Sequence, residues 1–133
     1  MHSPIVLCVD DRSEVLKFRK ATLESQGYRV KLASSGYAAI KTLEETSVAA
    51  VLLEYKREGM DAENVGCHIK QRFPNLPVIL LSADLEMPER ILWLVDEYVM
   101  KSEMPEGLVP IVRRVCRLAP RSTRKRQRNG AAA

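Results

Sequence analysis

The sequence predicts an α/β protein whose central sheet is parallel and covered by helices on both faces. Short apolar runs alternate five times with segments of helical spacing, which is the pattern of parallel strands joined by crossover helices. Most of these runs are apolar at successive positions, as expected for strands buried on both faces. For five such strands the common doubly wound order is 2-1-3-4-5, with a ligand site at the carboxyl ends of strands one and three.

The expected strands are short, and all but the second and the last are continuous apolar runs. They are residues 5–9, 28–33, 48–53, 78–81 and 97–100. The second alternates polar and apolar residues, so we expect it to be more exposed. The third run ends at Glu54 and the fourth at Ser82.

Five segments have the spacing or the boundary residues of helices. They are residues 14–26, 36–45, 61–73, 87–95 and 105–118. Ser13 is the expected N-cap of the first helix, which Gly27 ends, and Ser35 is the expected N-cap of the second. The last helix has Pro105 near its first turn. Apolar positions at helical spacing on the first helix are Val15, Leu16, Phe18, Ala21, Thr22 and Leu23.

Length and composition fit one compact domain. The chain has 133 residues, of which 46% are hydrophobic and 29% charged, so a core can form without a disulfide or metal staple. No apolar run approaches the ~20 residues that span a bilayer, and no signal peptide is expected. The cysteines Cys8, Cys67 and Cys116 are widely spaced and odd in number, which is typical of reduced thiols in a cytoplasmic protein.

Charge divides the chain into a domain, residues 1–119, and a basic tail, residues 120–133, expected to be disordered. Residues 1–112 hold 13 basic and 17 acidic residues, whereas eight basic residues and no acid follow. The tail has no aromatic residue to stack on bases. It could attract nucleic acid only non-specifically, through phosphates.

Polar residues follow the predicted strands at one edge of the sheet. They are Asp10 and Asp11, Glu54, Ser82 and Lys101. Carboxylates suit Mg²⁺, and an ammonium and a hydroxyl opposite them would hold phosphoryl oxygens. Any strand has to end in polar residues, and this explains each of these positions taken singly. It does not explain why acids, a hydroxyl and a lysine come together at one edge of the sheet. No P-loop or G-x-G-x-x-G is present, and neither His2 nor His68 has partners for nucleophilic hydrolysis, so an enzyme is not expected.

Five motifs in register resemble the receiver domain of bacterial two-component response regulators. They are Val9-Asp10-Asp11, Leu52-Leu53-Glu54-Tyr55, Gly59-Met60-Asp61, Leu80-Leu81-Ser82-Ala83 and Tyr98-Val99-Met100-Lys101. The resemblance covers residues 4–118 and implies a flavodoxin-like (βα)5 fold that receives a phosphoryl group from a histidine kinase with Mg²⁺. It implies a metal site of Asp10, Asp11, the residue-54 carboxylate and the Lys56 carbonyl. It also implies that Ser82 is the switch hydroxyl, Tyr98 the rotating aromatic and Lys101 the phosphoryl partner.

The sequence departs from that family where it matters for phosphorylation. Glu54 stands where the family has its phosphoacceptor aspartate, and it is longer by roughly 1.5 Å, so its carboxylate should enter the phosphoryl space. The single negative charge of Glu54 imitates a phosphorylated aspartate only in part. The resting conformation of the protein is therefore either active-like or inactive-like. Ser102 and Glu58 replace prolines, so we expect altered loops. Lys56 is expected to be a solvated loop residue, or to pair with Glu54 or Asp84.

These observations predict a stand-alone pseudo-receiver that signals through protein–protein contacts and binds Mg²⁺ weakly. The expected partner is a histidine kinase, an output protein or a second copy of the chain. The expected surface is the face of residues 87–95, 97–100 and 105–118, with Trp93 partly exposed and Ile91, Leu92 and Val95 in the core. Two alternatives remain: a phosphoacceptor that uses Glu54, Asp10 or Asp11, and a nucleic-acid-associated adaptor acting through the tail.

Overall fold

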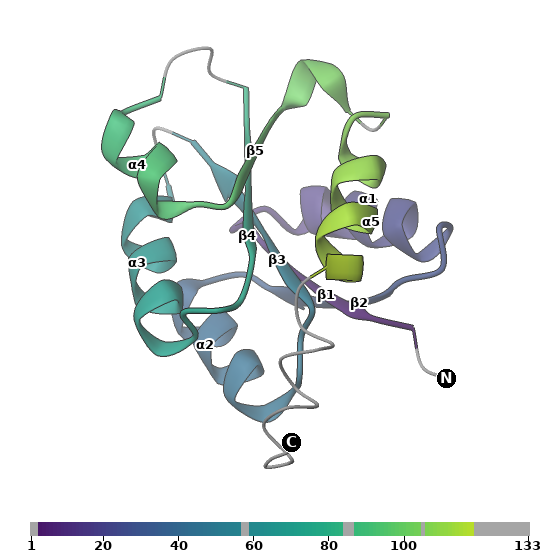
Figure 1. Cartoon of the computed structure of the whole chain (residues 1–133), viewed down its shortest axis with the longest axis horizontal. Helices are drawn as coiled ribbons and strands as arrows, with labels where there is room; N and C mark the ends of the chain where they lie inside the picture. The colour runs from purple at the N-terminus through teal and green to yellow at the C-terminus, as the bar shows by residue number, and fades with distance from the viewer. Residues whose placement is uncertain (1–2, 57–58, 84–86, 105, 119–133) are drawn as a thin grey trace.

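The protein is a five-stranded parallel sheet between two layers of helices (Figure 1). The computed structural model describes residues 3–56, 59–83, 87–104 and 106–118. The strands are β1 (Ile5–Val9), β2 (Arg29–Ala33), β3 (Ala50–Tyr55), β4 (Val78–Ser82) and β5 (Glu97–Met100). Their order in the sheet is β2-β1-β3-β4-β5, which confirms the predicted doubly wound topology.

Five α-helices connect and follow the strands. They are α1 (Ser13–Glu24), α2 (Gly36–Glu45), α3 (Ala62–Arg72), α4 (Glu89–Leu94) and α5 (Leu108–Leu118), with a 3₁₀ turn η1 (Lys101–Glu103) after β5. Helices α1 and α5 cover one face of the sheet, and α2, α3 and α4 cover the other (Figure 1). Among the described residues, no helix is long and apolar enough to cross a membrane.

Alternation along each strand divides the core into two clusters. On β1, Val6 and Cys8 pack with the α1 and α5 side, and Leu7 with the opposite cluster. On β3, Leu52 belongs to the first cluster and Leu53 to the second. Successive residues point to opposite faces of a strand, so a strand covered on both faces needs apolar side chains at every position. This is why the buried strands are continuous apolar runs in the sequence.

Several helix boundaries differ from the prediction. Ser35 does cap α2, since its hydroxyl accepts from the Ala38 N–H at 3.1 Å, but Ser13 is the first residue of α1 and not its cap. Asp61 is the N-cap of α3, where its carboxylate accepts from the Asn64 N–H at 3.0 Å. The last two helices begin at Glu89 and Leu108, later than predicted. Pro105, Glu58, Asp84 and the tail lie outside the described residues.

The turn after α1 requires the glycine that the sequence placed there. Gly27 has φ of +95°, in the left-handed region that side chains with a Cβ seldom adopt. Its N–H donates to the Glu24 carbonyl at 3.0 Å, and the next N–H, of Tyr28, donates to the Leu23 carbonyl at 3.2 Å. The helix end is satisfied in this way, and the chain reverses directly into β2.

Candidate functional site

The carboxyl ends of β1 and β3 hold three acids, as predicted, but β3 begins and ends two residues later than the predicted strand of residues 48–53. Asp10 follows β1 directly, whereas Glu54 lies inside β3, which runs on to Tyr55. In the parallel register Glu54 is opposite Leu81 and Tyr55 is opposite Ser82. Glu54 therefore has the same parity as Leu52, and its side chain lies on the face that α1 and α5 cover.

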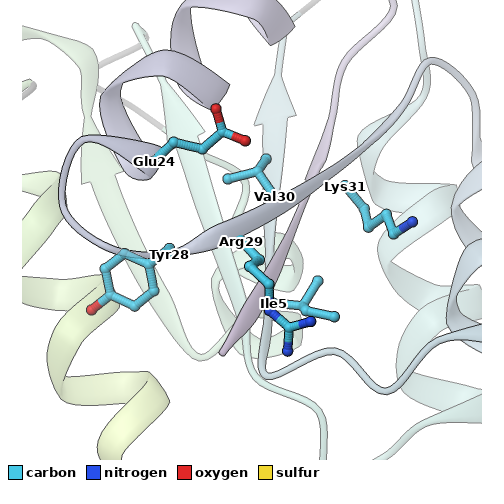
Figure 2. A pocket seen from close by; sticks show the side chains of 6 residues that line it. All are labelled: Ile5, Glu24, Tyr28, Arg29, Val30 and Lys31. Carbon is cyan, nitrogen blue, oxygen red and sulfur yellow. The ribbon is translucent and has the colours of Figure 1, made fainter. Parts of the chain in front are cut away.

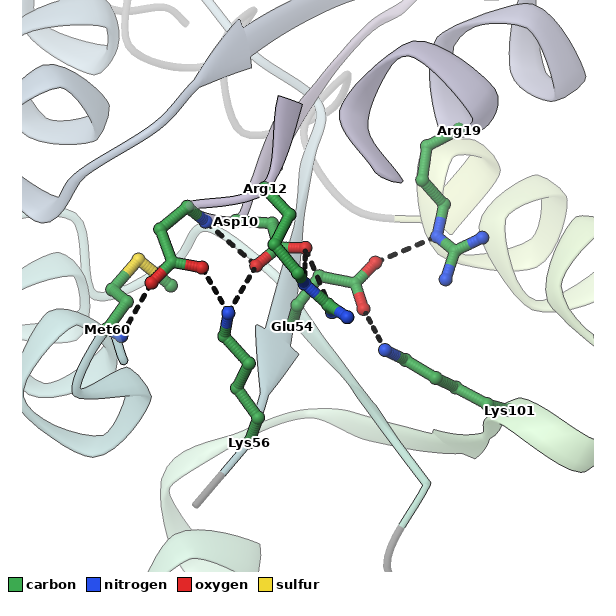
Figure 3. A network of polar contacts seen from close by, with 8 residues as sticks. Asp10, Arg12, Arg19, Glu54, Lys56, Met60 and Lys101 are labelled. Carbon is green, nitrogen blue, oxygen red and sulfur yellow. Dashed lines mark hydrogen bonds and ion pairs between the residues drawn. The ribbon is translucent and has the colours of Figure 1, made fainter. Parts of the chain in front are cut away.

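Glu54 is buried between two cations (Figure 3). Its side chain is 2% exposed. Arg19 Nε donates to Oε2 at 2.8 Å. Oε1 makes no hydrogen bond of good geometry, yet Lys101 Nζ lies 2.8 Å from it as an ion pair. Burial of a carboxylate without such pairing would be costly, so the two cations compensate for the loss of water around Glu54.

Arg19 is the site residue that sequence reasoning missed. It is 7% exposed and lies with Leu16 and Leu23 among the buried residues of α1. These three are spaced three and four residues apart, which is one helical face. Phe18, which we expected on that face, is 57% exposed. The signal was present in the spacing, because a stripe through residues 16, 19 and 23 places an arginine in the core, opposite the end of β3.

Asp10 and Asp11 form a second group with Lys56 and Arg12, and Figure 3 shows Asp10 between Lys56 and Arg12. Lys56 Nζ contacts Asp11 Oδ1 and lies 3.8 Å from Asp10 Oδ1. Arg12 Nε donates to Asp10 Oδ2 at 3.1 Å. The Met60 N–H donates to Asp11 Oδ2 at 2.9 Å. The hydrogen bond from Lys56, more than any other contact, lowers the pKa of Asp11 from its ordinary value.

The expectation that Lys56 is a solvated loop residue or pairs with Glu54 is wrong, whereas its alternative partner Asp84 lies outside the described residues, so that pairing stays a prediction. The Lys56 side chain is 25% exposed, so it is not a solvated loop residue. Among the described residues its ion pairs are with Asp10 and Asp11 and not with Glu54.

The acids are not arranged as one metal ligand set. Among the described residues, no three carboxylate, histidine or cysteine side chains come close enough together to hold a metal ion. Glu54 is directed to Arg19 and Lys101, and the oxygens of the two aspartates are engaged by basic side chains and backbone N–H groups. In this arrangement the site does not fit a divalent cation. The predicted ligand set of Asp10, Asp11, Glu54 and the Lys56 carbonyl is not assembled in this arrangement, and it stays a prediction.

The other predicted residues lie along the same edge. Ser82 is fully buried as the last residue of β4, Tyr98 is half-buried on β5, and Lys101 begins the 3₁₀ turn. Ser102 lies within that turn, where the Met100 N–H donates to Glu103 Oε1 at 3.1 Å. The functional roles predicted for these residues stay predictions.

Exposure on α4 agrees with the prediction only in part. Trp93 is 82% exposed and Ile91 is buried, as expected. Val95, at the C-cap, is partly buried against the core. Leu92 is 42% exposed, so its expected core position is wrong. Trp93 and Leu92 thus give the short helix two neighbouring apolar side chains that face solvent.

A hollow of about 450 Å³ lies away from this edge, beside the amino ends of β1 and β2 (Figure 2). Ile5, Tyr28 and Val30 line it together with the charged side chains of Glu24, Arg29 and Lys31. It is open to solvent and shares no residue with the acids of the sheet edge, so we assign it no part in their chemistry.

Comparison with known proteins agrees with this fold. The profile of the response regulator receiver domain matches residues 6–113. An NtrX-like response regulator of Rickettsia felis is 30% identical over 116 residues, which cover 84% of this chain and 24% of the relative. The transcriptional regulatory protein PrrA of Mycobacterium leprae is 32% identical, over 85% of this chain and 48% of that protein. The chain thus spans between a quarter and a half of the length of these curated relatives.

Solved structures show the same architecture. The response regulator TrrA of Thermotoga maritima, crystallised with Mg²⁺ and beryllofluoride, superposes with a TM-score of 0.76 at 26% identity, over 84% of this chain and 98% of that one. A CheY-like receiver of Methanospirillum hungatei gives a TM-score of 0.77 at 21% identity, over 86% and 94%. The matched profile covers most of the chain, and the strand order is that of the matched structures: this chain belongs to the response regulator receiver domain family, whose members work in two-component signalling.

Proposed function

We propose that this chain is a pseudo-receiver that signals by protein–protein contact and is not switched by phosphorylation of an aspartate. The observation that carries the proposal is the pairing of Glu54 with Arg19 and Lys101. The longer carboxylate reaches the lysine that a phosphoryl group would otherwise contact. Both carboxylate oxygens are already matched by positive charge, so Glu54 is a poor nucleophile and leaves little room for an incoming phosphoryl donor.

Positioning makes phosphoryl transfer sensitive to such an intrusion. The reaction forms a bond from a carboxylate oxygen to phosphorus while the bond from phosphorus to the donor oxygen breaks, and these two oxygens must be in line. A displacement of about 1 Å can lower the rate ~10²-fold. Glu54 would have to leave Arg19, a buried partner at 2.8 Å, before it could attack in line. This disfavours the alternative in which Glu54 accepts the phosphoryl group.

The proposed partner is a protein that docks on the face made by α4, β5 and α5. Trp93, at 82% exposure, and Leu92 are apolar side chains on this face, and aromatic anchors of this kind are enriched at binding hot spots. The partner class stays as predicted: a histidine kinase, an output protein or a second copy. The nucleic-acid alternative depends on the basic tail, which lies outside the described residues.

Treatment with acetyl phosphate and Mg²⁺, followed by intact mass spectrometry, tests the proposal. The parent protein should gain no phosphoryl group. Glu54→Asp should gain one, because a carboxylate shorter by one methylene withdraws from Lys101 and opens the space. Lys101→Ala in the Glu54→Asp background is the matched control and should lower the gain, since it removes the cation that neutralises the phosphoryl charge. Stoichiometric phosphorylation of the parent would overturn the proposal.

A further inference from the structure

The ammonium group of Lys56 lies where the two aspartates of the sheet edge converge. Lys56 follows the last residue of β3, and the aspartates follow β1, so two neighbouring strands bring the three side chains together. Lys56 Nζ makes an ion pair with Asp11 and lies 3.8 Å from Asp10 Oδ1. The Asp10 side chain is fully buried. An ammonium in this place supplies the positive charge that a buried carboxylate needs.

The chain itself fills the remaining positions on both carboxylates. Asp10 Oδ1 accepts from the Asp11 N–H at 2.8 Å, and Oδ2 accepts from Arg12 Nε. Asp11 Oδ2 accepts from the Met60 N–H. Each of the four oxygens therefore has a donor or a cation from the protein, and two acids are balanced by two bases without any bound ion.

The charges of the described residues at this edge also disfavour a further cation. Among these residues three acids, Asp10, Asp11 and Glu54, face four bases. These are Arg12, Arg19, Lys56 and Lys101. The formal sum is +1, and a divalent cation would raise it to +3 in a partly buried region where charges are poorly screened. A metal ion becomes favourable here only if one of the bases leaves.

The backbone at Gly59 lies close to this arrangement. Gly59 has φ of +94°, in the left-handed region. A Cβ at this position would lie 2.6 Å from Asp11 Oδ2 and 3.2 Å from Lys56 Nζ. Only glycine lets the loop approach the pair this closely while keeping that backbone conformation. The position of the ammonium is thus supported by the backbone on one side and by two carboxylates on the other.

We propose that Lys56 is the resident cation of the Asp10–Asp11 pair, and that its ammonium must be displaced before Mg²⁺ or another divalent cation binds. The inference concerns the same edge as the proposed function, but it does not depend on whether Glu54 is phosphorylated. When a site is able to bind its ligand for only a fraction of the time, its apparent dissociation constant is the intrinsic constant divided by that fraction. If Lys56 occupies the pair nine-tenths of the time or more, removal of its charge raises metal affinity at least ~10-fold.

The variant that tests this is Lys56→Met, which keeps the backbone carbonyl and much of the side-chain volume but removes the charge. Titration with Mn²⁺, followed by the electron paramagnetic resonance signal of the free ion, measures affinity directly. Lys56→Met should bind Mn²⁺ at least ~10-fold more tightly than the parent. Lys41→Met, which removes an exposed charge from α2, is the matched control and should leave affinity unchanged. Adding Asp11→Asn to Lys56→Met should abolish the gain.

A second measurement uses the parent protein, so it does not depend on how the variants fold. In a Mg²⁺ titration followed by NMR of labelled lysine side chains, the Lys56 signals should shift together with the Asp10 and Asp11 amide signals, as the ammonium leaves. The proposal is overturned if the aspartate signals shift while Lys56 does not, or if Lys56→Met folds and binds Mn²⁺ no better than the parent. Neither result involves phosphoryl transfer, so failure here leaves the proposed function standing, and phosphorylation of the parent would leave this inference standing.

Discussion

Replacing Arg19 by methionine removes the buried partner of Glu54 while keeping much of the side-chain volume. Arg19 is 7% exposed, Glu54 is 2% exposed, and the atoms joined are 2.8 Å apart. Removing one partner of a buried ion pair costs about 3–5 kcal/mol, because the other charge stays buried without compensation. Lys101 remains on the second oxygen of Glu54, so we expect a loss near the lower limit, about 3 kcal/mol in the free energy of unfolding.

A double-mutant cycle in urea separates this pair from general damage to the core. Arg19→Met combined with Glu54→Met replaces both charges by apolar groups, which is often neutral or stabilising. The double variant should therefore recover most of the loss and give a coupling energy of about 2 kcal/mol or more. Arg114→Met, which breaks the exposed pair with Glu97, is the control and should cost at most about 1 kcal/mol. The reasoning is refuted if Arg19→Met costs no more than this control, or if the two single losses simply add.

Further predictions concern the thiols and the tryptophan. Burial raises the pKa of Cys8 to about 12 and that of Cys116 to about 11. Alkylation of the native protein at neutral pH should therefore modify Cys67, which is only half-buried, and should reach the other two cysteines only after unfolding. Peptide mass spectrometry identifies the modified residues. Trp93 should emit like indole in water and be quenched by acrylamide. A partner on the α4 face should shift its emission to the blue, whereas blue emission from the isolated monomer would contradict its 82% exposure.

The strands and their order followed from the sequence because burial on both faces leaves an unambiguous pattern. β1 and β5 have the predicted limits, and β4 extends the predicted run only by Ser82. β1 and β4 are apolar, except for Ser82, because the two helical layers leave these inner strands no solvent-facing side. Helix ends were predicted less well, because a hydroxyl near a helix start can be the cap, as at Ser35, or the first helical residue, as at Ser13.

The candidate site could be predicted as a set of positions but not as a set of contacts. Strand ends identified the acids and Lys101, because topology alone brings them to one edge. The partner of each acid depends on side-chain reach across elements, which one-dimensional spacing does not contain. Lys56 could be expected near the acids, but its ion pair with Asp11 and the close approach of Gly59 to both side chains could not be inferred from spacing. Arg19 was missed because the predicted buried face of α1 included Leu16 and Leu23 but placed the apolar Phe18, and not the neighbouring arginine, between them.

The extension of β3 to Tyr55 connects these findings. It places Glu54 on the α1 side of the sheet, where the stripe that contains Arg19 faces it. An aspartate at position 54 would be shorter by one methylene, roughly 1.5 Å, and could not keep both a 2.8 Å contact with Arg19 and one with Lys101. The length of Glu54 and the burial of Arg19 therefore depend on each other. The departure from an ordinary phosphoacceptor is therefore a property of this pair, in which the guanidinium of Arg19 places a positive charge beside the Glu54 carboxylate.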